Sequence, residues 1–268
     1  MSDVLKHRVD GDGPPLVLLN GGLMSMAAWD RVVARLAPAY RVVRCDLRGQ
    51  LLTPGPPPPT IAGHSRDVAC LLDHLGLDRV HVAGTSLGAF VGLRLAADRP
   101  GRVASLAAIT ATDRIDGDDA RIVRALREAC RAGAERGDGG AVLDALTERA
   151  FSPEWQAAHG GVLAERRRVI GRFPAAWFRD LDRLLAELES LDLRPILPAV
   201  RCPVLVLAAE HDRTFPPERS RALAAALPCA TMDVVPGAGH AVVVEAPESV
   251  AERLQSFLAR CGREGVHS

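Results

Sequence analysis

Lysine is almost absent from this chain, and so is any excess of charge of one sign. Lys6 is the single lysine, and the arginines that supply the other basic side chains are spread along the whole sequence. The 33 Lys and Arg residues balance 33 Asp and Glu residues, which gives a formal net charge of +0. Because no basic patch or stripe is visible, we expect neither nucleic acid nor an anionic membrane as a partner.

Long apolar runs and clustered cysteines are missing too. No uninterrupted apolar run is long enough to span a bilayer, and the charged segment from Met1 to Asp12 lacks the apolar core of a secretory signal. The six cysteines are scattered and form no Cys-x-x-Cys pair, which argues against a disulfide framework or a zinc site. We therefore expect a cytoplasmic protein with free thiols.

What the sequence does have is an alternation of short apolar runs with amphipathic stretches. Buried runs of this kind indicate an α/β fold, in which a mostly parallel sheet is covered by helices on both faces. The predicted strands are 4–9, 16–20, 41–45, 80–84, 103–110, 204–209 and 231–235, and the predicted helices are 29–36, 67–75, 87–97, 217–227 and 247–260.

The alternation stops between residues 113 and 195. No convincing strand occurs there, and apolar residues recur at helical spacing in four stretches, separated by glycine-rich and proline-containing breaks. We predict a core formed by residues 1–112 and 196–268, and a helical lid of about four helices formed by residues 113–195.

A Gly-x-Ser-x-Gly motif, Gly84-Thr85-Ser86-Leu87-Gly88, follows a predicted strand and opens a predicted helix. This setting is that of a nucleophile elbow, a tight turn in which larger residues at the glycine positions would collide with neighbouring backbone. An isolated motif of this kind is weak evidence, since an ordinary glycine-rich turn has the same pattern. With partners later in the chain, it predicts Ser86 as a nucleophile.

A serine hydroxyl needs a base, and the base needs an orienting acid. His240 lies in a loop directly after the last predicted strand and is the candidate base. Asp212 follows the strand before it and is the preferred acid, with Asp113 as the alternative. Backbone N–H groups of Leu87 and of Gly22, or of Leu23 instead, are expected to form an oxyanion hole.

With these segments in place, the chain resembles the α/β-hydrolase superfamily along nearly its whole length. The segments that carry the resemblance are Leu19-Asn20-Gly21-Gly22, Asp46-Leu47-Arg48-Gly49, the elbow, Glu210-His211-Asp212, and Gly239-His240 followed by Glu245-Ala246-Pro247-Glu248. Asn20, where many members carry histidine, is similar to the esterase and enol-lactone hydrolase branch. The resemblance implies about seven strands here rather than eight, because only one strand precedes residue 16.

The sequence departs from the family pattern after Gly49. Members usually continue with Gly-x-Ser, but this chain continues with Gln50-Leu51-Leu52-Thr53 and a proline-rich loop that ends at Pro59. Because this loop borders the pocket in the family, its change is expected to alter the shape of the pocket.

These features predict a serine hydrolase that cleaves a small carboxylic ester or lactone through an acyl-enzyme, without a metal or organic cofactor. An acyltransferase, a cyclase, a C–C bond hydrolase and a binding module that retains the triad stay open as alternatives, as do a monomer and a homodimer. Leu23 and three lid aromatics, Trp155, Trp177 and Phe178, are candidate pocket residues, although helix packing is the plainer role for the aromatics. The arginine run 166–168 is interpreted as a solvated helix face, with carboxylate binding as the alternative.

Overall fold

The computed structural model describes residues 4–50, 53, 55–58, 60–137 and 139–264. Leu51, Leu52, Pro54 and Pro59, which belong to the unusual loop noted above, lie outside the described residues. Within the described part, none of the helices combines the length and the apolar character needed to cross a membrane.

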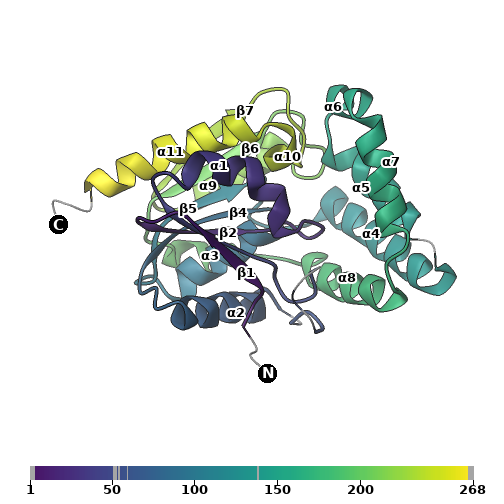
Figure 1. The fold of residues 1–268 in the computed structure, drawn as a ribbon, viewed down its shortest axis with the longest axis horizontal. Helices are drawn as coiled ribbons and strands as arrows, with labels where there is room; N and C mark the ends of the chain where they lie inside the picture. Colours follow the sequence, from purple (N-terminus) through teal and green to yellow (C-terminus); the bar gives the residue numbers. More distant parts are fainter. Residues whose placement is uncertain (1–3, 51–52, 54, 59, 138, 265–268) are drawn as a thin grey trace.

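A seven-stranded sheet forms the centre of the molecule, as the sequence predicted (Figure 1). Its order is β1-β3-β2-β4-β5-β6-β7, and only β1 runs antiparallel to its neighbour. The strands are β1 (His7–Asp10), β2 (Pro15–Leu19), β3 (Arg41–Cys45), β4 (Val80–Thr85), β5 (Val103–Ile109), β6 (Val204–Ala209) and β7 (Ala230–Val235). The parallel strands place their carboxyl ends along one edge, where ligands of such sheets bind.

Both faces of the sheet are covered because its inner strands are apolar on both sides. Along β2, Leu16 and Leu18 join one buried cluster, and Val17 and Leu19 join the other. Helices α1 (Asp30–Leu36) and α11 (Pro247–Glu264) cover the first face. Helices α2 (Ile61–His74), α3 (Leu87–Asp98) and α9 (Pro217–Ala226) cover the second, where their buried side chains share one apolar cluster. The fold is therefore the doubly covered α/β sheet that the alternating pattern predicted.

The segment between β5 and β6 is helical throughout its regular structure and lies beyond the sheet edge (right in Figure 1). It contains α4 (Gly117–Arg136), α5 (Gly140–Ala150), α6 (Pro153–Ala158), α7 (Gly160–Ile170) and α8 (Ala175–Leu188). At its base, Arg114 and Asp192 form an isolated antiparallel bridge. We call residues 113–195 the lid; their assignment as a helical insertion in the core, with bounds at 113 and 195, stays a prediction.

The prediction of four lid helices was wrong by one, because α6 was missed. It has only six residues, too few for a helical apolar pattern, but its start carries local signals. The Ser152 side chain accepts a hydrogen bond from the N–H of Trp155, and Pro153 occupies the first turn.

Helix α2 begins at Ile61, earlier than the predicted residue 67. Thr60 caps it, since its side chain accepts a hydrogen bond from the N–H of Gly63. His64, which the sequence placed before a helix, therefore lies within one and is fully buried.

Three short elements were not predicted as such: η1 (Met26–Trp29), η2 (Leu197–Ala199) and α10 (Val242–Glu245).

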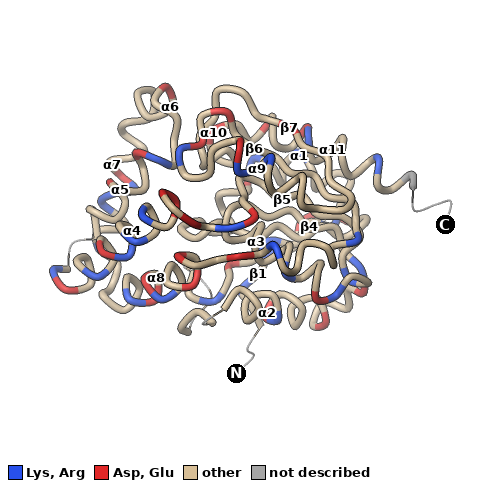
Figure 2. Tube along the Cα trace, turned by 180° about the vertical axis from the view of Figure 1, so that it is seen from behind, with Lys and Arg blue, Asp and Glu red and all other residues tan. Residues whose placement is uncertain are grey.

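Charged residues of both signs alternate along the lid helices, as Figure 2 shows, and many of them pair with each other.

Candidate active site

Ser86 sits at the carboxyl end of β4, in the turn that opens α3. Its backbone is held at φ 51° and ψ −115°, a strained conformation for a residue with a side chain. The flanking glycines are required by space: a Cβ at Gly84 would lie 2.3 Å from the carbonyl oxygen of Gly88. A Cβ at Gly88 would in turn lie 2.3 Å from the carbonyl oxygen of Leu19. The turn has the geometry that a nucleophile elbow requires.

Asp212 and His240 meet at the same edge of the sheet. Nδ1 of His240 lies 2.8 Å from Oδ2 of Asp212, so Nε2 is the ring nitrogen left for another partner. The other carboxylate oxygen of Asp212 accepts hydrogen bonds from the N–H groups of Thr214 and Phe215, both at 2.8 Å. The carboxylate is buried and fixed on both sides, which orients the imidazole.

Asp113, the alternative acid, has other partners. Its carboxylate lies 3.2 Å from Nη1 of Arg114 and 3.4 Å from the hydroxyl of Thr112. The structure therefore pairs His240 with Asp212 and not with Asp113.

Glu245 holds the loop that carries His240, a role that sequence reasoning did not assign. Its Oε1 accepts a hydrogen bond from the N–H of Gly239 at 3.0 Å, and its Oε2 accepts one from the hydroxyl of Ser152 at 2.7 Å. The histidine loop is thereby joined to the start of α6 in the lid. The segment from Glu245 to Glu248 carries part of the resemblance to the family, and this resemblance is the signal in the sequence that points to Glu245.

The loop after β2 is fixed by a buried polar network around Asn20. The Asn20 amide donates to Oδ1 of Asp46 at 2.8 Å and to Oε1 of Gln50 at 3.2 Å, and its oxygen accepts from the indole N–H of Trp29 at 3.0 Å. Gln50 also donates from Nε2 to the carbonyl oxygen of Gly21, at 2.6 Å. Gln50, which the sequence identified only as a departure, holds the Gly21–Gly22 peptide, whose N–H is the predicted oxyanion donor.

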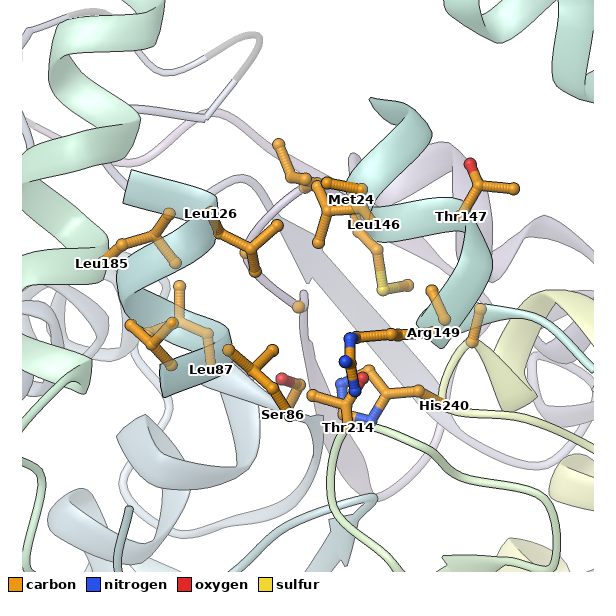
Figure 3. Close-up of a pocket in the computed structure, with 18 of the residues that line it drawn as sticks. Met24, Ser86, Leu87, Leu126, Leu146, Thr147, Arg149, Leu185, Thr214 and His240 are labelled. Carbon is orange, nitrogen blue, oxygen red and sulfur yellow. The ribbon is translucent and has the colours of Figure 1, made fainter. Parts of the chain in front are cut away.

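A cavity of about 160 Å³ opens above these residues (Figure 3). Ser86, Leu87, Gly22 and His240 line it from the core. The lid contributes mainly apolar side chains from α4, α5 and α8, namely Ile122, Val123, Leu126, Val142, Leu143, Leu146, Leu181, Leu185 and Leu188. A largely apolar cavity with a few polar groups at its base is typical of binding sites for small molecules.

Three of the four predicted pocket residues do not line this cavity. Leu23 does line it, and Trp177 lines a neighbouring cavity that shares Gly22 and Leu23 with it. Trp155 instead stacks between Phe151 and His159, with ring centroids at 4.4 and 4.1 Å.

Phe178 is fully buried and packs against Gly139. Helical spacing marks an apolar face, but the face of α8 that meets the pocket begins one turn later, at Leu181.

Among the described residues, no group of three or more His, Cys, Asp or Glu side chains is placed to hold a metal ion.

Comparison with known proteins places this chain in a family. Residues 14–247 match the model of the alpha/beta hydrolase fold. A protein of Caulobacter sp. (strain K31) named "Putative carbamate hydrolase RutD" is 33% identical over 96% of both chains. A protein of the same name from Variovorax paradoxus (strain S110) is 31% identical over 98% of both.

Two solved structures with a similar fold support this assignment. The enol-lactonase from Burkholderia xenovorans LB400 is 28% identical, covers 95% of this chain and 96% of its own, and superposes with a TM-score of 0.83. A thermophilic esterase from Thermogutta terrifontis is 27% identical, with coverage of 96% and 93% and a TM-score of 0.85. The chain belongs to the α/β-hydrolase superfamily.

Proposed function

We propose that this protein is a serine hydrolase that cleaves a small carboxylic ester or lactone through an acyl-enzyme. The observation that carries the proposal is the pairing of His240 with Asp212 beside a cavity that also exposes Ser86 on its strained turn. The similarity to an enol-lactonase and an esterase over more than nine-tenths of the chain supports the same substrate class.

The reaction follows from the arrangement. Ser86 Oγ attacks the substrate carbonyl carbon while Nε2 of His240 takes its proton, and Asp212 stabilises the imidazolium through Nδ1. The N–H groups of Gly22 and Leu87 stabilise the negative charge on the carbonyl oxygen. His240 then protonates the leaving alkoxide, and later deprotonates the water that releases the acid from Ser86.

A carbamate is the second candidate substrate, favoured by the names of the curated relatives at 31–33% identity. Its carbonyl would be attacked by the same serine, so the two candidates differ in substrate and not in machinery. Parallel kcat/KM measurements on p-nitrophenyl acetate and p-nitrophenyl N-methylcarbamate decide between them.

A fluorophosphonate probe tests the nucleophile. We expect stoichiometric labelling of Ser86, found by peptide mapping, and no labelling of Ser86→Ala. Labelling of another residue, or labelling that survives in Ser86→Ala, would refute the assignment.

A matched pair of variants tests the acid. Asp212→Asn should lower kcat on p-nitrophenyl acetate by about 10⁴-fold, because the wrong imidazole tautomer is favoured. Asp113→Asn should leave kcat within about threefold, since Asp113 pairs with Arg114 and Thr112 and not with His240. If only the Asp113 variant is inactive, Asp212 is not the acid.

A further inference from the structure

Two guanidinium groups line a cavity that is otherwise largely apolar. Arg149 comes from α5, and Figure 3 shows its side chain extending toward Thr214 and His240. Arg166 comes from α7 and lines both this cavity and the neighbouring one that holds Trp177. Both groups lie on the lid, facing the region where a substrate would bind.

Neither guanidinium has a carboxylate within ion-pair distance in the part of the chain that the structure describes. Arg149 makes only a long hydrogen bond, from Nη1 to the carbonyl oxygen of Arg213 at 3.5 Å. Arg166 is half-buried and lies over the ring of Phe151, 5.7 Å from its centroid. This burial also lowers the pKa of Arg166.

The neighbouring arginines on the same helix behave differently. Arg167 pairs with Asp144, with Nε 2.9 Å from Oδ1, and Arg168 pairs with Glu165 on the exposed side of α7. Asp119 is the one acidic side chain among the described residues that line the cavity, and Arg219 already lies 2.6 Å from it. Among the three arginines of α7, the one that lines the cavity is therefore the one without an acidic partner in the described residues.

A guanidinium that loses solvent without gaining a carboxylate is costly, and a bound anion relieves that cost. Its planar array of N–H donors matches a carboxylate in a two-point contact. Building on the proposed function, we infer that the substrate is an ester or lactone whose acyl chain carries a second, free carboxylate. Arg166, supported by Arg149, binds that carboxylate, while the leucines of α4, α5 and α8 hold the connecting chain.

The kinetic test compares matched substrates. Monomethyl half-esters of the dicarboxylic acids from succinate to suberate are set against methyl esters of monocarboxylic acids of equal chain length. We expect kcat/KM to be higher for at least one half-ester than for its neutral match. Arg166→Gln should lower kcat/KM on that half-ester about ten- to a hundredfold, chiefly through KM, because a charge-assisted hydrogen bond is lost.

Controls separate this role from a structural one. Arg166→Gln should leave kcat/KM on the neutral ester within about twofold of the wild-type value. Arg168→Gln, which removes an exposed arginine from the same helix, should leave kcat/KM on both substrates unchanged. Arg149→Gln should show a smaller loss on the half-ester, since Arg149 is more exposed. Equal losses on both substrates in Arg166→Gln, or no preference for any half-ester, would overturn the inference.

A binding measurement makes the result independent of turnover. The free dicarboxylates should raise the Tm of the wild-type protein and of Arg168→Gln, but not that of Arg166→Gln, and the matching diamides should have no effect. If neutral esters are cleaved without any of these differences, the carboxylate site is wrong and the hydrolase proposal stands. If the dicarboxylates bind through Arg166 but Ser86 is never labelled or acylated, the site stands and the hydrolase proposal fails.

Discussion

At the scale of single residues, the site depends on side chains that fix backbone groups. Gln50 shows this best, because its one amide group forms hydrogen bonds with three partners. Its Oε1 accepts from the N–H of Leu47 at 2.9 Å and from Asn20, and its Nε2 donates to the carbonyl oxygen of Gly21. In a trans peptide the C=O and the N–H point in opposite directions. Holding the Gly21 oxygen on one side therefore directs the Gly22 N–H to the other, so Gln50 is a positioning residue for the oxyanion hole.

Gln50→Met, which keeps the length of the side chain but removes both polar groups, tests this role. We expect kcat on p-nitrophenyl acetate to fall at least about tenfold, with KM little changed. The loss should be smaller than the roughly 10²–10³-fold loss caused by deleting an oxyanion donor outright. A variant that loses Tm but keeps its kcat would show that Gln50 is only structural.

At the scale of the secondary-structure elements, α2 carries an unusual buried group. The His64 side chain is fully buried, and both ring nitrogens lack a hydrogen-bond partner in the described structure. Burial first, and the charge of Arg48 second, lower the pKa of His64 from 6.5 to about 4. The neutral ring is therefore built into the core, and charging it disfavours the folded state.

This shift predicts how stability depends on pH. Between about pH 6.5 and 4 the unfolded chain binds a proton at His64 that the folded chain does not. Stability from this group is therefore complete above pH 6.5 and is lost as the pH falls toward 4, by up to about 3 kcal/mol.

Urea unfolding at a series of pH values measures the effect. His64→Leu should flatten the fall in the free energy of unfolding over that range, because no hydrogen bond is lost and no proton is taken up. His74→Leu, at the exposed end of the same helix, is the control. The expectation is wrong if the His74 variant flattens the curve as much.

At the scale of the whole molecule, an ion-pair cluster joins the lid to the core. Arg219 on α9 lies 2.7 Å from Oδ1 of Asp116 and 2.6 Å from Oδ2 of Asp119, both at the start of the lid. Asp119 is buried beside the cavity, and this burial raises its pKa although Arg219 opposes the shift. Arg219 thus compensates a carboxylate that is buried away from water.

Removing Arg219 should weaken the attachment of the lid to the core. Arg219→Gln should lower the free energy of unfolding by about 1–3 kcal/mol, because the buried Asp119 carboxylate loses its countercharge. The double variant Arg219→Gln with Asp119→Asn should recover part of the loss, since the uncompensated charge is then gone. Denaturant unfolding checks both, and a double variant that is no more stable than the single one would exclude this explanation.

The sequence alone determined the sheet, because the core strands are short apolar runs whose burial follows from local pattern. It also singled out Ser86 and His240 and ranked Asp212 above Asp113, since each stands directly after a strand and parallel strands end at one edge. The tertiary structure decided what depends on packing between distant segments. It brings Asp212 to His240 and the Gln50 side chain to the carbonyl oxygen of Gly21. It also lines the cavity with leucines and not with Trp155 or Phe178. Helical periodicity tells which face of a lid helix is buried, but only the docking of one helix on another decides whether that face meets its neighbours or the substrate.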